Sequence, residues 1–68
     1  MSQRLVYSML KELGGKAKAR DVMRYAKTRY PEYALYSCVW DRLHKLKKWG
    51  IIRYNPMTLE YYIVQDYE

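Results

Sequence analysis

Residues 35–52 read LYSCVWDRLHKLKKWGII, and this stretch decides the fold that the sequence predicts. Its apolar residues recur with the period of one face of an α-helix, at Leu35, Val39, Leu43 and Leu46. The glycine at position 50 predicts the end of the helix, because glycine adopts the left-handed cap conformation without a steric cost. The two isoleucines that follow are β-branched and favour a strand. We therefore expect a helix from Leu35 or Ser37 to Trp49 that leads directly into a strand.

Two shorter helices are predicted before this stretch. The first is capped by Ser2, whose hydroxyl can accept a hydrogen bond from a backbone N–H, and it runs to about Leu13, where a pair of glycines ends it. Its apolar face is expected to contain Leu5, Val6, Met9, Leu10 and Leu13. Tyr7 and Lys11 lie off this face and are expected in solvent.

The second helix is expected from about Ala19 to Arg29, because Pro31 cannot continue a helix. Its expected buried positions are Val22, Met23, Ala26 and Tyr30. The segment from Lys16 to Lys18 is interpreted as the connection between the first two helices. The connection across residues 30–34 is short, which keeps the second and third helices adjacent.

A β-hairpin is predicted after the third helix. Residues 51–54 and 59–64 are the two strands, and Asn55-Pro56-Met57-Thr58 has the composition of a turn. Alternation places Leu59, Tyr61 and Ile63 on one face of the second strand and the residues between them on the other. The last four residues are expected to fray.

Positive charge is concentrated in the middle of the chain. The chain of 68 residues has 13 Lys and Arg, 7 Asp and Glu, a net charge of +6 and a pI near 9.6. Residues 16–53 hold eleven basic and three acidic side chains, whereas residues 54–68 hold only acidic ones. This concentration favours a polyanionic partner, with a basic surface kept for solubility as the alternative.

Composition also limits the other classes of protein. The length predicts one domain with a small core. Cys38 is the only cysteine, so a disulfide within the chain and a multi-cysteine zinc site are both excluded. No apolar run approaches the ~20 residues that span a bilayer, and no secretory signal is present, so we expect a cytoplasmic protein. The scattered carboxylates, the lone His44 and the lack of a glycine-rich loop argue against an enzyme and against a bound cofactor.

The segments DRLHKLKKWGII (41–52), RYN (53–55) and LEYYIV (59–64) resemble the recognition helix, glycine, strand and wing of winged helix-turn-helix domains in small prokaryotic and archaeal regulators. The resemblance covers most of the chain. It implies an α+β fold over residues 1–68, with a three-helix helix-turn-helix core followed by a two-stranded β-hairpin wing. The absence of Phe beside nine Tyr hints at a heat-adapted archaeal or archaeal-viral source.

The resemblance also implies how DNA is bound, with the third helix in the major groove. The residues that would contact base edges are Tyr36, Ser37, Trp40, Asp41 and His44. Those that would contact phosphates from the same helix are Lys45, Lys47 and Lys48. The start of the second helix would contribute Lys16, Lys18 and Arg20, and the wing would contribute Arg53, Asn55 and Thr58. Because the turn holds no Arg or Lys, we do not expect deep insertion into the minor groove.

Several of these residues have a second interpretation. Trp40 lies at the edge of the apolar face and either completes the core or contacts DNA, whereas Trp49 is expected to pack. Arg42 either flanks the core or pairs with an acidic group. Asp41 would repel phosphates unless it reads a cytosine amino group or orients a basic neighbour. The tyrosines are expected to pack, with possible stacking roles for Tyr33, Tyr36, Tyr61 and Tyr62.

The sequence thus predicts a double-stranded DNA-binding protein, and specifically a transcriptional regulator. One alternative is a nucleoid-type protein that coats DNA without sequence preference. The other is a protein-interaction module that uses the tyrosine-rich hairpin. Because many proteins of this fold bind paired half-sites, we also expect a homodimer, formed through the first helix, the hairpin or the tail.

Overall fold

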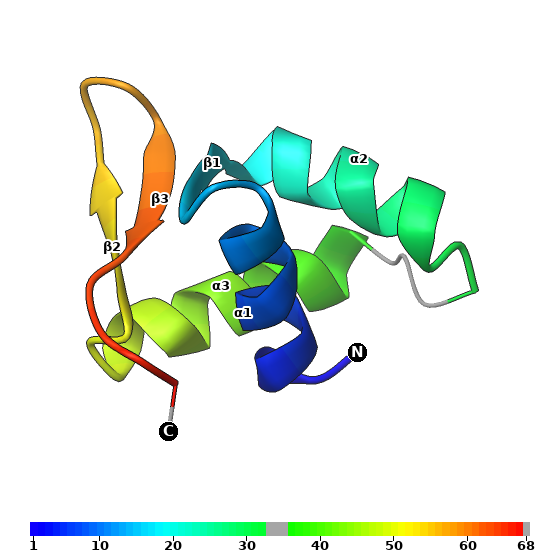
Figure 1. Cartoon of the computed structure of the whole chain (residues 1–68), viewed down its shortest axis with the longest axis horizontal. Coiled ribbons are helices and arrows are strands. Elements are labelled where there is room, and N and C mark those ends of the chain that lie inside the picture. Colours follow the sequence, from blue (N-terminus) through cyan, green and yellow to red (C-terminus); the bar gives the residue numbers. More distant parts are fainter. Residues whose placement is uncertain (33–35, 68) are drawn as a thin grey trace.

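The computed structural model describes residues 1–32 and 36–67, without the side chain of Tyr36. The described elements are α1 (Gln3–Glu12), β1 (Lys16–Lys18), α2 (Ala19–Arg29), α3 (Tyr36–Lys48), β2 (Ile52–Asn55) and β3 (Glu60–Ile63) (Figure 1). The predicted α+β class and the three helices are confirmed. The predictions for Tyr33 and Leu35 lie outside the described residues.

Both predicted glycine stops end a helix in the same way. Gly50 has a φ of 78°, its N–H donates to the carbonyl of Lys47, and the N–H of Ile51 donates to the carbonyl of Leu46. Gly14 has a φ of 98°, and α1 ends with the equivalent pair of bonds. This is the Schellman arrangement, which satisfies carbonyls that the helix leaves unpaired. At the other end of α1, the hydroxyl of Ser2 accepts a hydrogen bond of 3.1 Å from the N–H of Leu5, as predicted.

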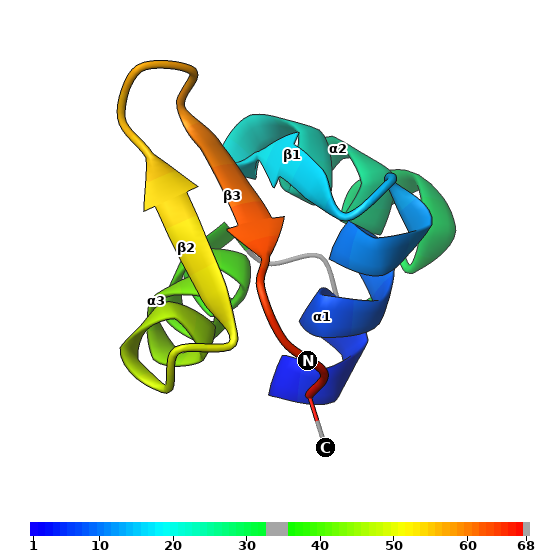
Figure 2. The ribbon, with the colours of Figure 1, turned by 60° about the vertical axis from the view of Figure 1, so that its left-hand side comes forward.

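The sheet has three antiparallel strands in the order β1-β3-β2, so the prediction of a two-stranded hairpin was incomplete. Residues 16–18, interpreted above as a connection, form β1 and pair with residues 60–62 of β3 (Figure 2). The bond from the N–H of Ile63 to the carbonyl of Gly15 extends this pairing. Three residues with a single apolar side chain give no local strand signal, because the partner strand lies more than forty residues away.

One hydrophobic core lies between the helices and the inner face of the sheet. Its fully buried large side chains are Val6, Met9, Leu10, Val22, Val39, Leu43, Leu46 and Ile52. Most positions predicted to be buried are so, although Leu5, Leu13 and Tyr30 are only half-buried. Tyr7, expected in solvent, is 7% exposed, because Tyr67 folds back over it with ring centroids 5.7 Å apart. Trp49, expected to pack, is 70% exposed.

The hairpin extends beyond the helical part of the molecule. In both views its tip projects past α2 and β1, on the side away from the beginning of the chain (Figures 1 and 2). Its strands are paired from Ile52 with Ile63 to Asn55 with Glu60. Antiparallel pairing on both sides makes β3 the central strand. The hairpin is therefore anchored to α2 through β1 and to α3 through the short turn at Gly50.

Candidate nucleic-acid interface

The outer face of α3 carries most of the predicted base-contacting side chains. Ser37, Trp40, Asp41 and His44 are exposed, and α3 begins at Tyr36. Trp40 is 42% exposed, so it only partly completes the core. Its ring stacks on His44 one helical turn away, with centroids 6.0 Å apart and an interplanar angle of 29°. The i,i+4 spacing places the two rings next to each other on one face of the helix.

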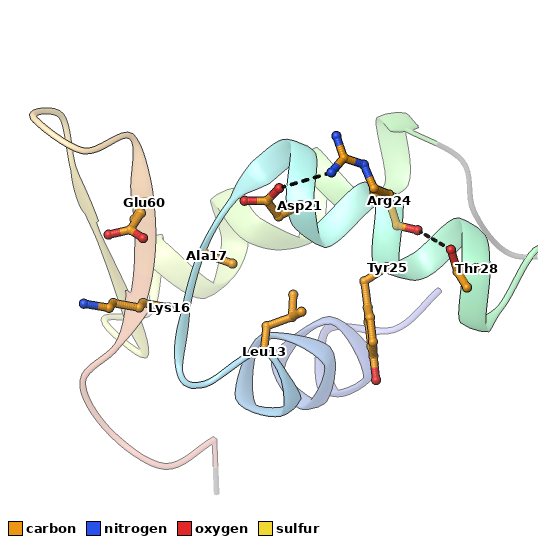
Figure 3. A pocket seen from close by; sticks show the side chains of 8 residues that line it. All are labelled: Leu13, Lys16, Ala17, Asp21, Arg24, Tyr25, Thr28 and Glu60. Carbon is orange, nitrogen blue, oxygen red and sulfur yellow. Dashed lines mark hydrogen bonds and ion pairs between the residues drawn. The ribbon is translucent and has the colours of Figure 1, made fainter.

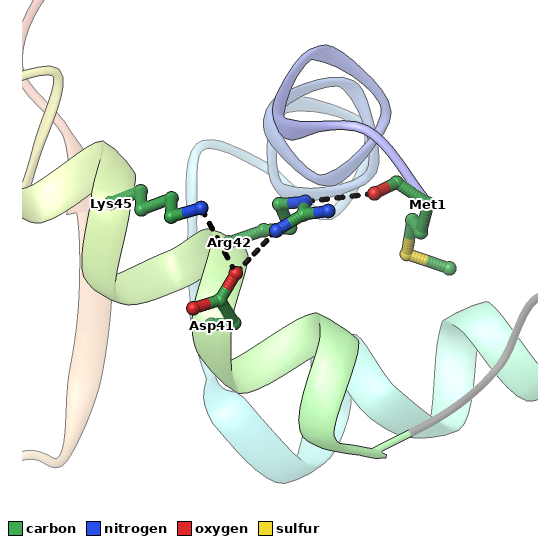
Figure 4. Close-up of polar contacts among 4 residues, drawn as sticks. All are labelled: Met1, Asp41, Arg42 and Lys45. Carbon is green, nitrogen blue, oxygen red and sulfur yellow. Dashed lines mark hydrogen bonds and ion pairs between the residues drawn. The ribbon is translucent and has the colours of Figure 1, made fainter.

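Asp41 is surrounded by basic groups (Figure 4). Its carboxylate contacts the guanidinium of Arg42 and lies 3.4 Å from the Nζ atom of Lys45. Arg42 also donates from Nε to the backbone carbonyl of Met1 at 2.8 Å. The negative charge of Asp41 is thus locally compensated, and Arg42 has the acidic partner that was one of its two interpretations. Because the pairs are half-exposed, each stabilises the fold by less than about 1 kcal/mol.

The side chains of the other two lysines of α3 have different surroundings. The Nζ atom of Lys47 lies 5.6 Å from the centroid of the Tyr54 ring, a cation–π contact that connects the helix to β2. Lys48 is exposed and makes no ion pair with the described residues. α3 therefore presents cations along both its hairpin side and its outer face.

Two of the three predicted cations at the start of α2 lie beside α3. Lys18 is the N-cap residue of α2 and makes no side-chain capping hydrogen bond, and Arg20 is exposed in the first turn. Neither makes an ion pair within the described part of the chain. Both line a cleft that also contains Trp40.

This cleft, called here the Trp40 cleft, lies where three elements meet. It has a volume of about 240 Å³ and is lined by Lys18, Ala19, Arg20, Trp40, Tyr54, Leu59 and Tyr61. Rings and aliphatic groups form its walls, two cations stand at the start of α2, and no carboxylate lines it. The rings of Tyr54 and Tyr61 meet across the two strands with centroids 4.8 Å apart. Burial raises the pKa of Tyr61, so its phenol stays neutral over the physiological range.

Lys16 and Arg53 are not part of this cleft. They pair with Tyr62 from opposite sides of β3, whereas the next row of the sheet consists of Ala17, Tyr61 and Tyr54. Successive side chains of a strand point to opposite faces, and Ala17 and Tyr61 are buried. Lys16 and Arg53 therefore lie on the outer face of the sheet. Lys18 shares the face of Lys16, two residues further along β1, but it stands where the chain enters α2 and lines the Trp40 cleft, whereas Lys16 and Arg53 do not.

The hairpin tip is apolar and uncharged. Asn55 shapes it, since its Oδ1 atom accepts from the N–H of Met57 at 2.9 Å and its carbonyl accepts from the N–H of Leu59 at 2.7 Å. Thr58 is exposed, and Met57 is 89% exposed. Leu59 has a φ of 65°, a left-handed conformation that costs a non-glycine residue about 1–2 kcal/mol.

A larger and more open pocket lies on another side of the molecule (Figure 3). It has a volume of about 440 Å³ and is lined by Leu13, Lys16, Ala17, Asp21, Arg24, Tyr25, Thr28 and Glu60. Asp21 and Arg24 pair within it at 3.9 Å. The Tyr25 hydroxyl donates to the carboxylate of Glu12, and this hydrogen bond raises the pKa of Tyr25. Because its lining mixes both signs of charge, this pocket favours a polyanion less than the Trp40 cleft does.

Sequence reasoning missed three residues around the cleft and the tip: Tyr54, Met57 and Leu59. A four-residue hairpin loop without glycine was the available signal. In this loop the residue in the left-handed region carries a Cβ atom, and it is Leu59. Tyr54 is identified by its register with Tyr61, which a single sequence does not reveal.

The comparisons with known proteins assign no activity to this chain, and neither do the side chains of the described residues. No protein-family model, curated protein or solved structure matches this chain. Across residues 1–32 and 36–67, no helix has the length and apolar character needed to cross a bilayer. Within the same residues, no three His, Cys, Asp or Glu side chains gather as a metal site.

Proposed function

We propose that this protein is a winged-helix domain that binds double-stranded DNA and regulates transcription, with α3 inserted in the major groove. The observation that carries the proposal is the juxtaposition, at one cleft, of the outer face of α3, the cations at the start of α2 and the hairpin. A major groove admits an α-helix, and its base edges are distinguishable there. The hairpin then lies along the adjacent strand as the wing.

Roles within the interface follow from the contacts of each side chain. His44, stacked on Trp40, and Ser37 present ring and hydroxyl groups to base edges. Lys47 and Lys48 face phosphates, while Lys45 is shared with Asp41. Asp41 compensates the charges of Lys45 and Arg42, because its carboxylate contacts both, and it competes with phosphates for Lys45. Lys16 and Arg53 are not among the residues that line the cleft.

The deciding experiment is duplex binding measured by fluorescence anisotropy over a range of salt concentrations. A protein that neutralises several phosphates loses affinity linearly on a log–log plot against salt. Replacing Lys45, Lys47 and Lys48 together by Ala should reduce this slope by about two to three, whereas Lys11→Ala on α1 should leave it unchanged. No binding by the unaltered protein to any duplex at low salt contradicts the proposal.

The ratio of the affinity for a selected site to the affinity for random DNA distinguishes sequence-specific regulation from non-specific coating. A regulator should bind a site selected from a random pool at least about 10³-fold more tightly than random DNA at physiological salt. A ratio near one assigns the protein instead to the nucleoid type. The same duplexes, analysed by sedimentation, test the proposed homodimer, since a complex of one 8.3 kDa chain per site contradicts it.

One observation favours a protein-interaction module as the second candidate. Trp49 is 70% exposed beside Ile51, Gln3 and Tyr67, at the end of α3 opposite to the Trp40 cleft. Large exposed aromatic side chains are enriched in protein interfaces. Under this alternative the triple lysine variant keeps full function and Trp49→Ala abolishes it. Under the DNA-binding proposal the triple lysine variant loses duplex affinity, and Trp49→Ala binds the duplex like the unaltered protein.

A further inference from the structure

The Trp40 cleft combines an apolar floor with unpaired positive charge, and few partners match both. Trp40, Leu59 and Tyr54 supply carbon surface, while Lys18 and Arg20 supply positive charge from the start of α2. Neither cation makes an ion pair with the described residues, and the cleft has no acidic side chain of its own. Such a lining complements a group that is apolar on one side and anionic beside it. A deoxyribose between two phosphates has this character.

The size of the cleft agrees with a small occupant. Its 240 Å³ lie below the range of about 300–1,000 Å³ typical of pockets that enclose drug-sized ligands. The cleft is also lined by the start of α2, by α3 and by the hairpin, so its occupant contacts three elements at once. A single unit of a chain fits this space better than a free small molecule does.

Leu59 gives the second, independent indication. Its left-handed backbone would be adopted more readily by glycine or asparagine, and its side chain is 53% exposed, so core packing does not explain the choice of leucine. Backbone strain that serves no core contact is typically stored at a binding surface. At this strained position Leu59 lines the cleft together with Trp40. The cleft therefore has two apolar walls held by different elements.

We propose that the Trp40 cleft receives one sugar–phosphate unit of a DNA strand, with the deoxyribose between Trp40 and Leu59 and the flanking phosphates on Lys18 and Arg20. The inference rests on the proposed DNA-binding function and deepens it. In this arrangement the hairpin contacts the backbone of the DNA strand through an apolar side chain. The tip of the hairpin therefore does not have to be basic. The stacking of His44 on Trp40 supports the other apolar side of the cleft.

Two kinds of variant separate the apolar and the ionic parts of the site. Leu59→Gly and Trp40→Ala should each weaken duplex binding about tenfold at fixed salt, while the slope of affinity against salt stays the same. Lys18→Ala and Arg20→Ala should each lower that slope by about one. The matched controls are Met57→Ala, an exposed apolar residue of the same hairpin, and Trp49→Ala, an exposed tryptophan next to the same helix. Both controls should bind like the unaltered protein.

Thermal unfolding of each variant completes the test. Leu59→Gly should unfold at the same temperature as the unaltered protein or higher, so weaker binding cannot be attributed to loss of the fold. If that variant is nevertheless unstable, Leu59→Asn keeps the left-handed conformation and gives the same reading. Equal affinity of the unaltered protein, Leu59→Gly and Trp40→Ala overturns the cleft proposal and leaves DNA binding intact. Unchanged salt slopes for both cation variants overturn it as well. Absence of duplex binding by the unaltered protein overturns the proposed function itself.

Discussion

Tyr54 and Tyr61 face each other across β2 and β3, with ring centroids 4.8 Å apart and planes inclined by 48°. Tyr61 is buried against the core, and Tyr54 extends the pair towards Lys47 of α3. This row of aromatic rings joins the inner face of the hairpin to the helix beneath it. Tilted aromatic contacts of this kind contribute about 0.5–1.5 kcal/mol beyond their buried area.

Because the phenol of Tyr61 is buried, the free energy of unfolding should fall at alkaline pH. Burial, and then the charge of Tyr54, raise the pKa of Tyr61 above its usual value near 10. The folded state holds this proton more tightly than the unfolded state does. The resulting stability is fully present below about pH 10 and is lost as pH rises through the folded pKa. In urea unfolding, the free energy of unfolding of Tyr61→Phe should therefore fall less steeply above about pH 10 than that of the unaltered protein. Parallel curves for the two proteins contradict this expectation.

Gly50 is required for its backbone conformation and not for space. A Cβ atom added there meets only the side-chain nitrogen of Gln65, at an ordinary contact distance of 3.6 Å. The φ of 78° nevertheless disfavours alanine, so Gly50→Ala should destabilise the fold by about 1–2 kcal/mol. Gly50→Asn should lose less, because asparagine tolerates this conformation. If Gly50→Ala and Gly50→Asn lose equal stability in chemical denaturation, contacts with Gln65 and not the backbone conformation determine the loss.

Removing the charge of Asp41 should improve DNA binding. Its carboxylate faces the same side as the proposed phosphate contacts and shares Lys45. We expect Asp41→Asn to tighten duplex binding by about fivefold at low salt, with less gain at high salt, where surface charges are screened. The change in folding free energy should stay within about 1 kcal/mol. Asp66→Asn changes the net charge equally but lies beside α1, and it should leave affinity unaltered. Weaker binding by Asp41→Asn would instead assign Asp41 a direct base contact.

The cap of α1 provides a local measure of stability. The hydroxyl of Ser2 accepts from the N–H of Leu5, which has no partner within the helix. Ser2→Ala should therefore cost about 1 kcal/mol in urea unfolding. Ser8→Ala, within the same helix and away from its ends, serves as the control and should not destabilise the protein through capping.

The helices and the hairpin were predictable because their signals are local. Apolar periodicity and single glycines determine α3 and its end at Gly50 without reference to the rest of the chain. β1 was not predictable in this way, because its three residues become a strand only by pairing with β3. Tyr7 was placed wrongly for the same reason, since the chain end returns over it through Tyr67. Trp49 was placed wrongly because the helix ends beside it and the chain turns away before anything covers the ring.

The candidate site was only partly predictable. The exposed face of α3 follows from its apolar face, since opposite positions of a helix point away from each other. The Trp40 cleft does not follow, because it combines the start of α2, the middle of α3 and a left-handed leucine in the hairpin loop. Lys16 and Arg53 seemed equivalent to Lys18 and Arg20 in the sequence. In the structure Lys18 and Arg20 line the Trp40 cleft, whereas Lys16 lines the pocket of Figure 3 and Arg53 lines neither. Strand alternation does not predict this difference, because Lys16 and Lys18 share one face of β1.

The small strand β1 has a mechanical consequence. It continues into α2 without an intervening residue, and it is hydrogen-bonded to β3. The hairpin and α2 are therefore coupled through the backbone, and the opening of the cleft that they form with α3 exists without a ligand. A partner that enters between them has to conform to that opening. If the partner is DNA, the energy of adaptation falls on the duplex, and sequences that bend or change groove width easily would be selected even where no side chain touches a base.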